Sequence, residues 1–546
     1  MTNKNLKYIL ILIVLSYFFF AFGNNIVSLT NPDEVFYTLS AKEMQEHNTW
    51  MTPILFDQPQ FEKPIMIYWL IRISLVIFFP SVNFAARFFP AIFAMIGILA
   101  VYFLALLGFK NEKKAFVSGL ILMSCGLYIG LAKTVFTDMV FSVFILLALA
   151  AFYWGYAKSA KKGISLVLFF VFMGLAVLTK GPLGFLIPFL TVVIFLLLKK
   201  EIKYIVCKGT LWGILFFIAI SFPWYILMIK KYGESFTSEF FHNDHIRRLM
   251  EAEHISNDKW YFYPFSIIGC MFPWSLFLVA ALFYLFKNIK KASPIQLFLI
   301  CWIAVVFLIF QPAHSKLVSY IFPLFPALAL VCGDFVYNTA LLEHKNRQFF
   351  IISLLTWFFL LSLPIGLKVA LTKFPGYIST HIPVYIFIAI FLVLLILILN
   401  FILRYKLFKA IYSFVFVLPA FLLVIPLVHN DIEPYLSSKY ACGYLLKNYT
   451  VENKILCSKF FARGVRFYTG REVAVFDMGG HNFFSPHPIP FLNGDQKLRD
   501  FLHTQPVTYC VLKKSAVKDV ERIVGSMFKC TLLKQIGDEY LVKIEK

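Results

Sequence analysis

The chain has 546 residues, of which 60% are hydrophobic and only 15% are charged, and its mean hydropathy is +0.77. Soluble globular proteins are about half apolar and about a quarter charged, so this composition excludes that class. Apolar runs of about 20 residues recur along the chain, which is the pattern of a polytopic α-helical membrane protein. The net charge of +22 does not indicate nucleic acid, because the basic residues lie in short loops rather than in one patch.

The predicted membrane-spanning helices follow the apolar runs. The first run, from Tyr8 to Leu29, is too long for the core of a signal peptide and predicts a retained helix. The runs are residues 8–28, 84–109, 115–132, 139–157, 164–179, 181–198, 208–229, 261–286, 295–311, 316–336, 348–370, 382–404 and 408–428.

One shorter run, residues 65–80, decides the predicted topology. If it lies in the membrane interface instead of crossing, the N-terminus and all the Lys-rich loops fall on one side. The positive-inside rule makes that side the cytoplasm, which predicts about 13 spanning helices with the N-terminus inside and the C-terminus outside. The outer side then receives most of the acidic, His and unusual polar residues, in segments 29–83, 133–138, 180–182, 230–260 and 312–315.

The character of the chain changes near residue 429. Strand-length apolar runs then alternate with helix-like stretches, which predicts a small extracytoplasmic α/β domain over residues 429–546. Residues 1–428 form the predicted membrane domain, whose first outer loop, 29–83, carries interfacial helices. The C-terminal part holds four cysteines that could form disulfides outside the cytoplasm, with the pairing left open: Cys442, Cys457, Cys510 and Cys530.

Two acidic positions on the predicted outer face are candidates for chemistry. Asp33 lies in Asn31-Pro32-Asp33-Glu34, directly after the first apolar run, and Asp138 begins the fourth predicted helix. Either side chain could cap a helix. Asp33 could also take a proton from an acceptor hydroxyl, because acids near a membrane are costly unless they are solvated or functional. Glu34 is interpreted as structural.

Cationic and His side chains on the same face could bind phosphate or metal. Lys63 could pair with a lipid phosphate, and Glu62 beside a His could bind a divalent ion. Adjacent Arg residues near several His residues suit a phosphate clamp. For Lys180, the alternative is that its side chain snorkels towards the membrane surface. A Lys at the start of a helix, such as Lys316, opposes the helix dipole. The remaining candidates are His242, His245, Arg247, Arg248 and Tyr320.

A set of short motifs occurs in a fixed order along residues 8–330. The motifs are Asn31-Pro32-Asp33-Glu34, Phe61-Glu62-Lys63-Pro64 with Tyr68-Trp69, Thr137-Asp138, Leu178-Thr179-Lys180-Gly181-Pro182, Phe222-Pro223-Trp224-Tyr225, Phe272-Pro273-Trp274, and Ser315-Lys316 with Tyr320. Taken together, this set resembles bacterial glycosyltransferases of the GT-C fold related to protein O-mannosyltransferases, and especially the 4-amino-4-deoxy-L-arabinose transferases that modify lipid A.

The resemblance implies inverting transfer of a sugar from a polyprenyl-phosphate donor, such as undecaprenyl phosphate, to an acceptor outside the cytoplasm. Asp33 and Asp138 correspond to the family's two acids. Glu62 and Lys63 correspond to a metal contact and a phosphate contact, and Tyr320 to a lipid-phosphate contact. The metal, zinc or a similar divalent ion, would also be held by His242 or His245, and the phosphate by Arg247 or Arg248; the spacing does not choose within either pair.

The resemblance leaves the acceptor and two other classes of function open. Lipid A of the lipopolysaccharide, another envelope glycolipid, and Ser or Thr of secreted proteins all fit as acceptors. A transporter or flippase of lipid-linked sugars would also need basic residues and a lipid groove. An envelope scaffold acting through the C-terminal domain is the third alternative. The expected location is the bacterial cytoplasmic (inner) membrane among its lipids, with the site facing the periplasm and no nucleic acid partner.

Overall fold

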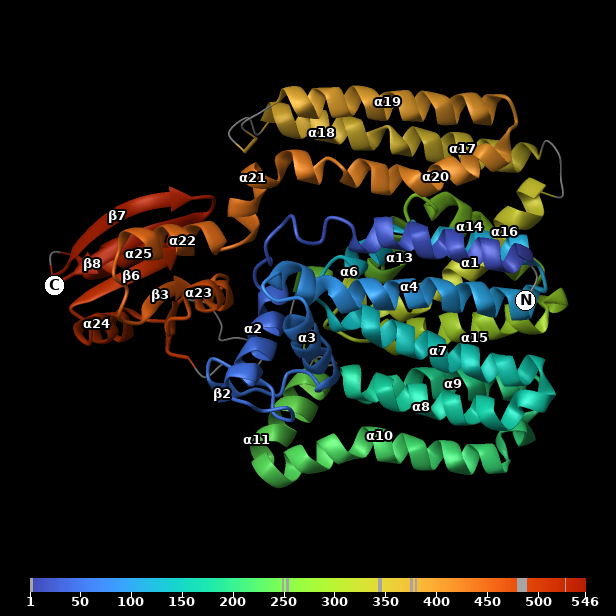
Figure 1. Ribbon diagram of the computed structural model, residues 1–546, viewed down its shortest axis with the longest axis horizontal. Helices are drawn as coiled ribbons and strands as arrows, with labels where there is room; N and C mark the ends of the chain where they lie inside the picture. Colours follow the sequence, from blue (N-terminus) through green and yellow to red (C-terminus); the bar gives the residue numbers. More distant parts are fainter. Residues whose placement is uncertain are drawn as a thin grey trace.

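The computed structural model describes residues 3–247, 250–251, 255–341, 346–373, 377–378, 381–478, 489–525 and 527–546, without the side chains of 244–246, 255 and 340–341. Figure 1 shows two parts, a bundle of long helices and a six-stranded sheet beyond one end of it. We call this the sheet end of the bundle. The N-terminus lies at the opposite end.

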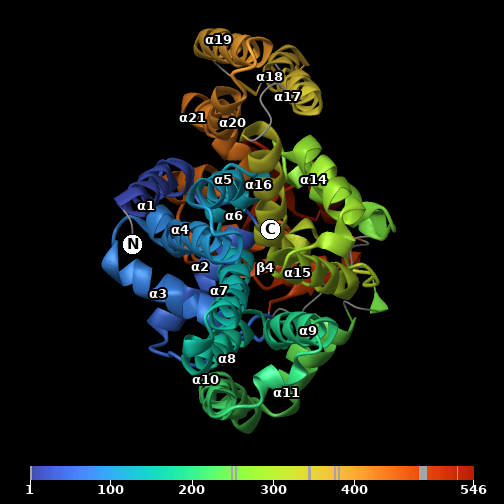
Figure 2. The same cartoon turned by 90° about the vertical axis from the view of Figure 1, so that its right-hand side faces the viewer.

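The bundle consists of predominantly apolar helices, and α17, α18 and α19 form an outer layer beyond α20 in both views (Figures 1 and 2). Its elements are α1 (Asn3–Ser16), η1 (Tyr17–Ala21), α4 (Val82–Phe109), α5 (Glu112–Met123), α6 (Gly126–Ala132), α7 (Thr137–Ala157), α8 (Lys162–Lys180), α9 (Leu183–Leu198), α10 (Lys208–Tyr232), α13 (Phe262–Cys270), α14 (Ser275–Lys287), α15 (Pro294–Phe310), η7 (Val318–Leu324), α16 (Phe325–Leu341), α17 (Arg347–Leu360), α18 (Ser362–Lys373), α19 (Ile382–Leu403), α20 (Leu407–Leu422) and α21 (Ile425–Leu436).

Within the described ranges, eight helices are long and apolar enough to cross a membrane, or up to eleven if each bent pair counts as one span. Three runs predicted as single helices are bent: α5–α6 by 67°, α13–α14 by 117° and α20–α21 by 47°. Proline explains two of these breaks, because Pro273 follows α13 and Pro426 begins α21, where a missing N–H interrupts helical bonding. The predicted total of about 13 spans stays a prediction.

The first loop folds at the sheet end into α2 (Asp33–Glu46), the short strands β1 (Ile54–Leu55) and β2 (Gln58–Pro59), and α3 (Met66–Ile77). With 12 residues, α3 is about 18 Å long, whereas the hydrocarbon core of a bilayer is about 30 Å thick. A helix of this length is shorter than the bilayer core, and the interfacial placement of the run 65–80 stays a prediction. This helix packs against α2 and α4.

The C-terminal sheet has the strand order β5-β4-β3-β6-β8-β7. Strands β3 and β4 are buried throughout and pair in parallel, and β3 also pairs in parallel with β6, as expected for a sheet covered on both faces. The strands are β3 (Ile455–Ser458), β4 (Val473–Phe476), β5 (Phe491–Leu492), β6 (Val507–Leu512), β7 (Lys529–Ile536) and β8 (Glu539–Glu545), and the helices are α22 (Lys439–Asn448), α23 (Ala462–Thr469), α24 (Asp495–His503) and α25 (Lys514–Val524).

The two faces of this sheet belong to different cores. Ile455 and Cys457 of β3 join the apolar core that continues into the helix bundle, while Leu456 between them joins a separate core with α24 and α25. This alternation is the period of two that a strand imposes. The predicted α/β character is therefore confirmed, and one face of the sheet is packed towards the bundle.

The expected disulfides are absent. All nine cysteines of the chain lie in the described residues and all are free thiols, including Cys442, Cys457, Cys510 and Cys530. Cys442, Cys457 and Cys510 are fully buried, where they serve as small apolar side chains.

Candidate functional site

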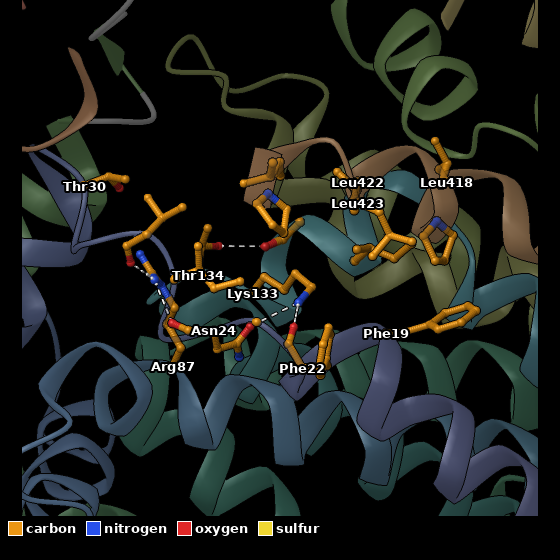
Figure 3. Close-up of a pocket in the computed structure, with 18 of the residues that line it drawn as sticks. Phe19, Phe22, Asn24, Thr30, Arg87, Lys133, Thr134, Leu418, Leu422 and Leu423 are labelled. Atoms are coloured by element: carbon orange, nitrogen blue, oxygen red, sulfur yellow. Dashed lines mark hydrogen bonds between the residues drawn. The ribbon is translucent and has the colours of Figure 1, made fainter. Parts of the chain in front are cut away.

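Asp33 and Glu34 are adjacent in the sequence but occupy different environments. The Glu34 side chain is 1% exposed and forms a two-pronged ion pair with Arg87 of α4, with Nε–Oε1 and Nη2–Oε2 distances of 2.8 and 2.5 Å. Glu34 also accepts hydrogen bonds from the backbone N–H groups of Thr30 and Val135. Figure 3 shows Arg87 and Thr30 at this corner. Glu34 is thus an internal anchor of the first loop.

Arg87 completes this anchor. Besides Glu34, its guanidinium donates to the carbonyl oxygens of Asn24, Val27 and Ser28, at 3.0, 2.6 and 3.1 Å. The connection between η1 and α2 therefore wraps around one buried cation, and the start of α2 is held against α4. Asp33, the first residue of α2, is positioned by this arrangement.

The Asp33 side chain, by contrast, is 54% exposed at the N-terminus of α2. One turn further, Tyr37 is buried, and its pKa is raised by burial first, and then by Tyr68 and the charges of Glu62, Asp138 and Asp33. Those three carboxylates come from three separate segments of the chain. All three are close enough to Tyr37 for their charges to act on its phenol.

The Phe61-Glu62-Lys63-Pro64 segment follows β2 and is tied down on both sides. The Gln60 amide donates to the Tyr68 hydroxyl at 2.7 Å, and the Phe61 N–H donates to Glu239 at 3.3 Å. Lys63 is buried, and its Nζ donates to the carbonyl oxygen of Glu62 at 3.2 Å. The neighbouring Glu62 and Lys63 are therefore held in a fixed loop beside α2.

Asp138 and Lys180 form a second charged pair. The Lys180 Nζ donates to Asp138 Oδ1 at 2.5 Å, and both side chains are largely buried. The same ammonium lies 4.9 Å from the centre of the Tyr320 ring, within range for a cation–π contact. Three predicted site residues, from α7, α8 and η7, thus meet at one point.

Lys316 has a carboxylate partner that the sequence analysis did not identify. Its Nζ lies 2.8 Å from Asp258 Oδ1, and His314 Nδ1 lies 2.8 Å from Asp258 Oδ2. Hydrogen bonds from His314 and Lys316 lower the pKa of the Asp258 carboxyl. Lys316 therefore joins the segment before η7 to the segment that contains Asp258.

The segment following α10 holds the remaining candidates. Arg247 forms an ion pair with Glu251 at 2.7 Å, and His242 is exposed. The His245 side chain and the whole of Arg248 lie outside the described residues. The choices between the two His and between the two Arg residues therefore stay open.

A cation from the C-terminal domain enters the site. The Arg463 guanidinium of α23 lies 4.0 Å from Asp33 and 3.9 Å from Glu62, and its carbon is 4.4 Å from the centre of the Phe36 ring. Its side chain is only 11% exposed. Arg463 thus faces both carboxylates while stacking on α2.

Arg466 and Gly464, on the same short helix, fasten α23 to the first loop. Arg466 forms ion pairs with the buried Glu43, at 2.9 Å, and with Asp57. A Cβ added at Gly464 would lie 2.1 Å from the side-chain oxygen of Asn31. Only glycine permits this approach, so the C-terminal domain packs directly on the motif that begins α2.

Comparison with known proteins shows which family the chain belongs to. The family model described as dolichyl-phosphate-mannose-protein mannosyltransferase matches residues 5–233. An undecaprenyl phosphate-alpha-4-amino-4-deoxy-L-arabinose arabinosyl transferase of Photorhabdus laumondii is 32% identical over 56% of this chain and 55% of its own length. An uncharacterised protein of Aquifex aeolicus is 31% identical over 68% of this chain and 72% of its own length. This chain belongs to the GT-C family of these proteins.

The fold agrees with that family membership. The crystal structure of ArnT from Cupriavidus metallidurans bound to undecaprenyl phosphate aligns over 98% of this chain and 97% of that one, with a TM-score of 0.79 and 19% identity. This likeness shows the GT-C fold. The match to the Photorhabdus transferase spans about half of that enzyme. The chain is accordingly a multi-pass membrane protein of this family.

The expected metal site does not fit the described residues. Among them, no group of three His, Cys, Asp or Glu side chains is arranged to hold an ion. Glu62, the predicted ligand, instead faces the Arg463 guanidinium at 3.9 Å. The role of Glu62, His242 and His245 as metal ligands therefore rests on the resemblance alone, and the proposed reaction includes no step that depends on a metal.

Proposed function

We propose that the protein is an inverting glycosyltransferase that moves a sugar, of the aminoarabinose type, from a polyprenyl-phosphate donor to lipid A or another envelope acceptor. One observation carries this proposal: the Asp33 and Glu62 carboxylates face the same Arg463 guanidinium at 4.0 and 3.9 Å, and Asp138 is paired with Lys180 at 2.5 Å. After burial, the charges of these three carboxylates also raise the pKa of Tyr37. Lys63 lies beside Glu62 and donates to its backbone carbonyl oxygen. Family membership supports the same reaction class.

Lys63 and Lys180 are suited to stabilise the leaving phosphate. As the bond between the anomeric carbon and the donor oxygen breaks, its electron pair passes to the phosphate, which becomes a dianion. Buried cations stabilise such growing charge strongly, because little water screens them. We assign this role to Lys63 and Lys180, with Tyr320 beside Lys180 as a contact to the donor phosphate.

Asp33 suits the acceptor side. It is the most exposed of the three carboxylates, so an acceptor can reach it. For a hydroxyl acceptor, Asp33 takes the proton as the oxygen attacks the anomeric carbon. For a lipid phosphate that is already ionised, Asp33 orients the attacking oxygen. A single displacement inverts the anomeric centre.

Arg463 is proposed as a positioning residue for this cluster. Its cation lies about equally close to the Asp33 and Glu62 carboxylates and offsets the repulsion between them. Because Arg463 belongs to α23, the C-terminal domain takes part in the reaction. We propose that the site and this domain face the periplasm and that the N-terminus is cytoplasmic, which agrees with the asymmetry of Lys and Arg along the loops.

The test is transfer from a synthetic polyprenyl-phosphate sugar by the purified chain. Asp33→Asn should reduce the rate by about a hundredfold or more, as loss of a general base does, with donor binding retained. Asp519→Asn, which removes an exposed carboxylate on α25, is the matched control. Full turnover by Asp33→Asn would overturn the role of Asp33. Movement of intact donor across vesicles without transfer would favour a flippase.

A protein acceptor is the second candidate, and the match of residues 5–233 to the protein mannosyltransferase model favours it. Mass spectrometry of envelope lipids and glycoproteins from a deletion strain separates the two. Loss of a pentosamine mass from lipid A supports the first proposal. Loss of a hexose mass from secreted proteins, with unchanged lipids, supports the second.

A further inference from the structure

A cavity of about 420 Å³ lies beside the Glu34–Arg87 pair (Figure 3). This volume is within the range of ligand pockets, about 300 to 1,000 Å³. The cavity is bounded by η1, α6, α20 and α21, and both bent pairs that contain α6, α20 and α21 change direction near it. Its apolar wall includes Phe18, Phe19, Phe22, Leu418, Leu422 and Leu423.

Lys133 supplies a positive charge to this cavity. Its Nζ donates to two neutral acceptors, the Phe22 carbonyl at 2.7 Å and the Asn24 side-chain oxygen at 3.2 Å. Arg87, which also lines the cavity, is neutralised by Glu34. Within the described part of the chain, no carboxylate forms an ion pair with Lys133.

The uncompensated charge is costly in these surroundings. Burial first, and then the nearby Arg87 charge, lower the pKa of Lys133 to about 8, so the amine is still mostly protonated at pH 7. A charge that is partly removed from water is normally paired. An anion bound in the cavity would offset the charge of Lys133, which is half-buried.

An unused donor lies next to the ammonium. Asn24 is 4% exposed and lines the cavity, and among the described residues its Nδ2 group has no hydrogen-bond acceptor. Buried amide donors are nearly always satisfied. Lys133 and Asn24 together present N–H groups to an oxygen-rich anion such as a phosphate.

We propose that this cavity is a binding site for an anionic bilayer phospholipid. The headgroup phosphate accepts hydrogen bonds from Lys133 and Asn24, and an acyl chain occupies the aromatic and aliphatic wall. A phospholipid would bind both parts of the cavity, with its phosphate at the polar part and its acyl chain at the apolar wall. A soluble anion would leave the apolar wall without a partner. Lys63 and Lys180, which we assign to the donor phosphate, do not line this cavity. The proposal therefore stands apart from the proposed function.

Gly130 offers a way to close the site. It lines the cavity, and a Cβ added there would meet no atom within 4 Å. Gly130→Phe should therefore fill the cavity without a backbone clash. Helix propensity also favours this change, because glycine is the poorest former after proline.

The experiment measures lipid retention by the full chain in nanodiscs of phosphatidylcholine with one-fifth phosphatidylglycerol. Native mass spectrometry should find bound phosphatidylglycerol on the wild type and on Lys133→Arg. Lys133→Gln should weaken retention about tenfold, as loss of a charged hydrogen bond does, and Gly130→Phe should abolish it. Lys158→Gln, at an exposed lysine distant in sequence from the cavity, is the control and should retain it.

Three outcomes would overturn the proposal. The first is equal phosphatidylglycerol retention by wild type, Lys133→Gln and Gly130→Phe. The second is equal retention of phosphatidylcholine and phosphatidylglycerol by the wild type. The third is displacement of the bound lipid by stoichiometric polyprenyl phosphate, which would assign the cavity to the donor. If Lys133→Gln does not fold, as judged by thermal unfolding, Gly130→Phe decides.

Discussion

Glu34→Gln separates structural anchoring from chemistry within one pair of adjacent acids. Glu34 and Arg87 are 1% and 6% exposed and share two hydrogen bonds. Removing the Glu34 charge leaves the buried guanidinium with only the carbonyls of Asn24, Val27 and Ser28. Breaking a buried ion pair from one side costs about 3 to 5 kcal/mol, and we expect Glu34→Gln to lose stability by that amount.

Thermal unfolding in detergent, followed by intrinsic fluorescence, measures this loss. The double variant Glu34→Gln with Arg87→Met removes the orphaned cation and should cost at least about 2 kcal/mol less than the sum of the single changes. At a temperature where Glu34→Gln is folded, its transfer rate should stay within about threefold of wild type. An unchanged Tm together with lost transfer would refute the structural role of Glu34.

Three further predictions concern the C-terminal domain. Arg463→Ala should lower kcat/KM about tenfold to a hundredfold (about 1.4 to 2.7 kcal/mol of transition-state stabilisation), because the Asp33 and Glu62 carboxylates lose the cation that faces them. Arg471→Ala, at an exposed position, should leave kcat/KM unchanged. Unchanged kinetics of Arg463→Ala would remove Arg463 from the site. Burial raises the pKa of Glu539 to about 7, so the folded state binds its proton more tightly than the unfolded state and stability falls as pH rises from about 4.5 through 7. Glu539→Gln should therefore raise Tm at pH 8, by an amount on the order of 3 kcal/mol of stability, and have little effect near pH 4.5; an equal gain at both pH values would contradict this. Arg466→Ala should speed hydrogen exchange in residues 47–60 without unfolding the sheet, and exchange that remains at the wild-type rate would show that Arg466 does not hold this loop.

The membrane domain could be predicted from the sequence where a single physical signal was strong. The length and apolarity of the runs predict the helices, and the charge asymmetry of the loops predicts that 65–80 does not cross. The bend in 261–286 was not predicted, because the run was interpreted as one continuous apolar helix although it contains Pro273. Pro273 marks the break after α13, but the sequence does not give the 117° angle between α13 and α14. Strand β7 was missed because its apolar residues do not alternate regularly: Leu532 and Leu533 are adjacent, where a bulge lies between Leu532 and Lys534.

Only part of the candidate site could be predicted from the sequence. Motif order and the polarity of the predicted outer face predict Asp33, Asp138, Lys63 and Lys180 as site residues, and these roles stay predictions. The structure pairs Asp138 with Lys180 and places Asp33 and Glu62, the neighbour of Lys63, at one guanidinium. Arg463 was missed because it contacts Asp33 across 430 positions of sequence, and no local pattern reports such a contact. The spacing of Arg463 and Arg466, three residues apart on an amphipathic helix, was the one available signal. Asp258 was missed because its partners, His314 and Lys316, lie in another loop.

The most direct measurement is product analysis after incubating the purified chain with a synthetic polyprenyl-phosphate aminoarabinose and lipid A. The proposed transfer predicts lipid A that is heavier by one sugar, release of polyprenyl phosphate in equal amount, and inverted anomeric configuration by NMR. Asp33→Asn should give neither the heavier lipid A nor the released polyprenyl phosphate. Retained anomeric configuration would contradict the single displacement, and unmodified lipid A with intact donor would contradict the proposed transfer itself.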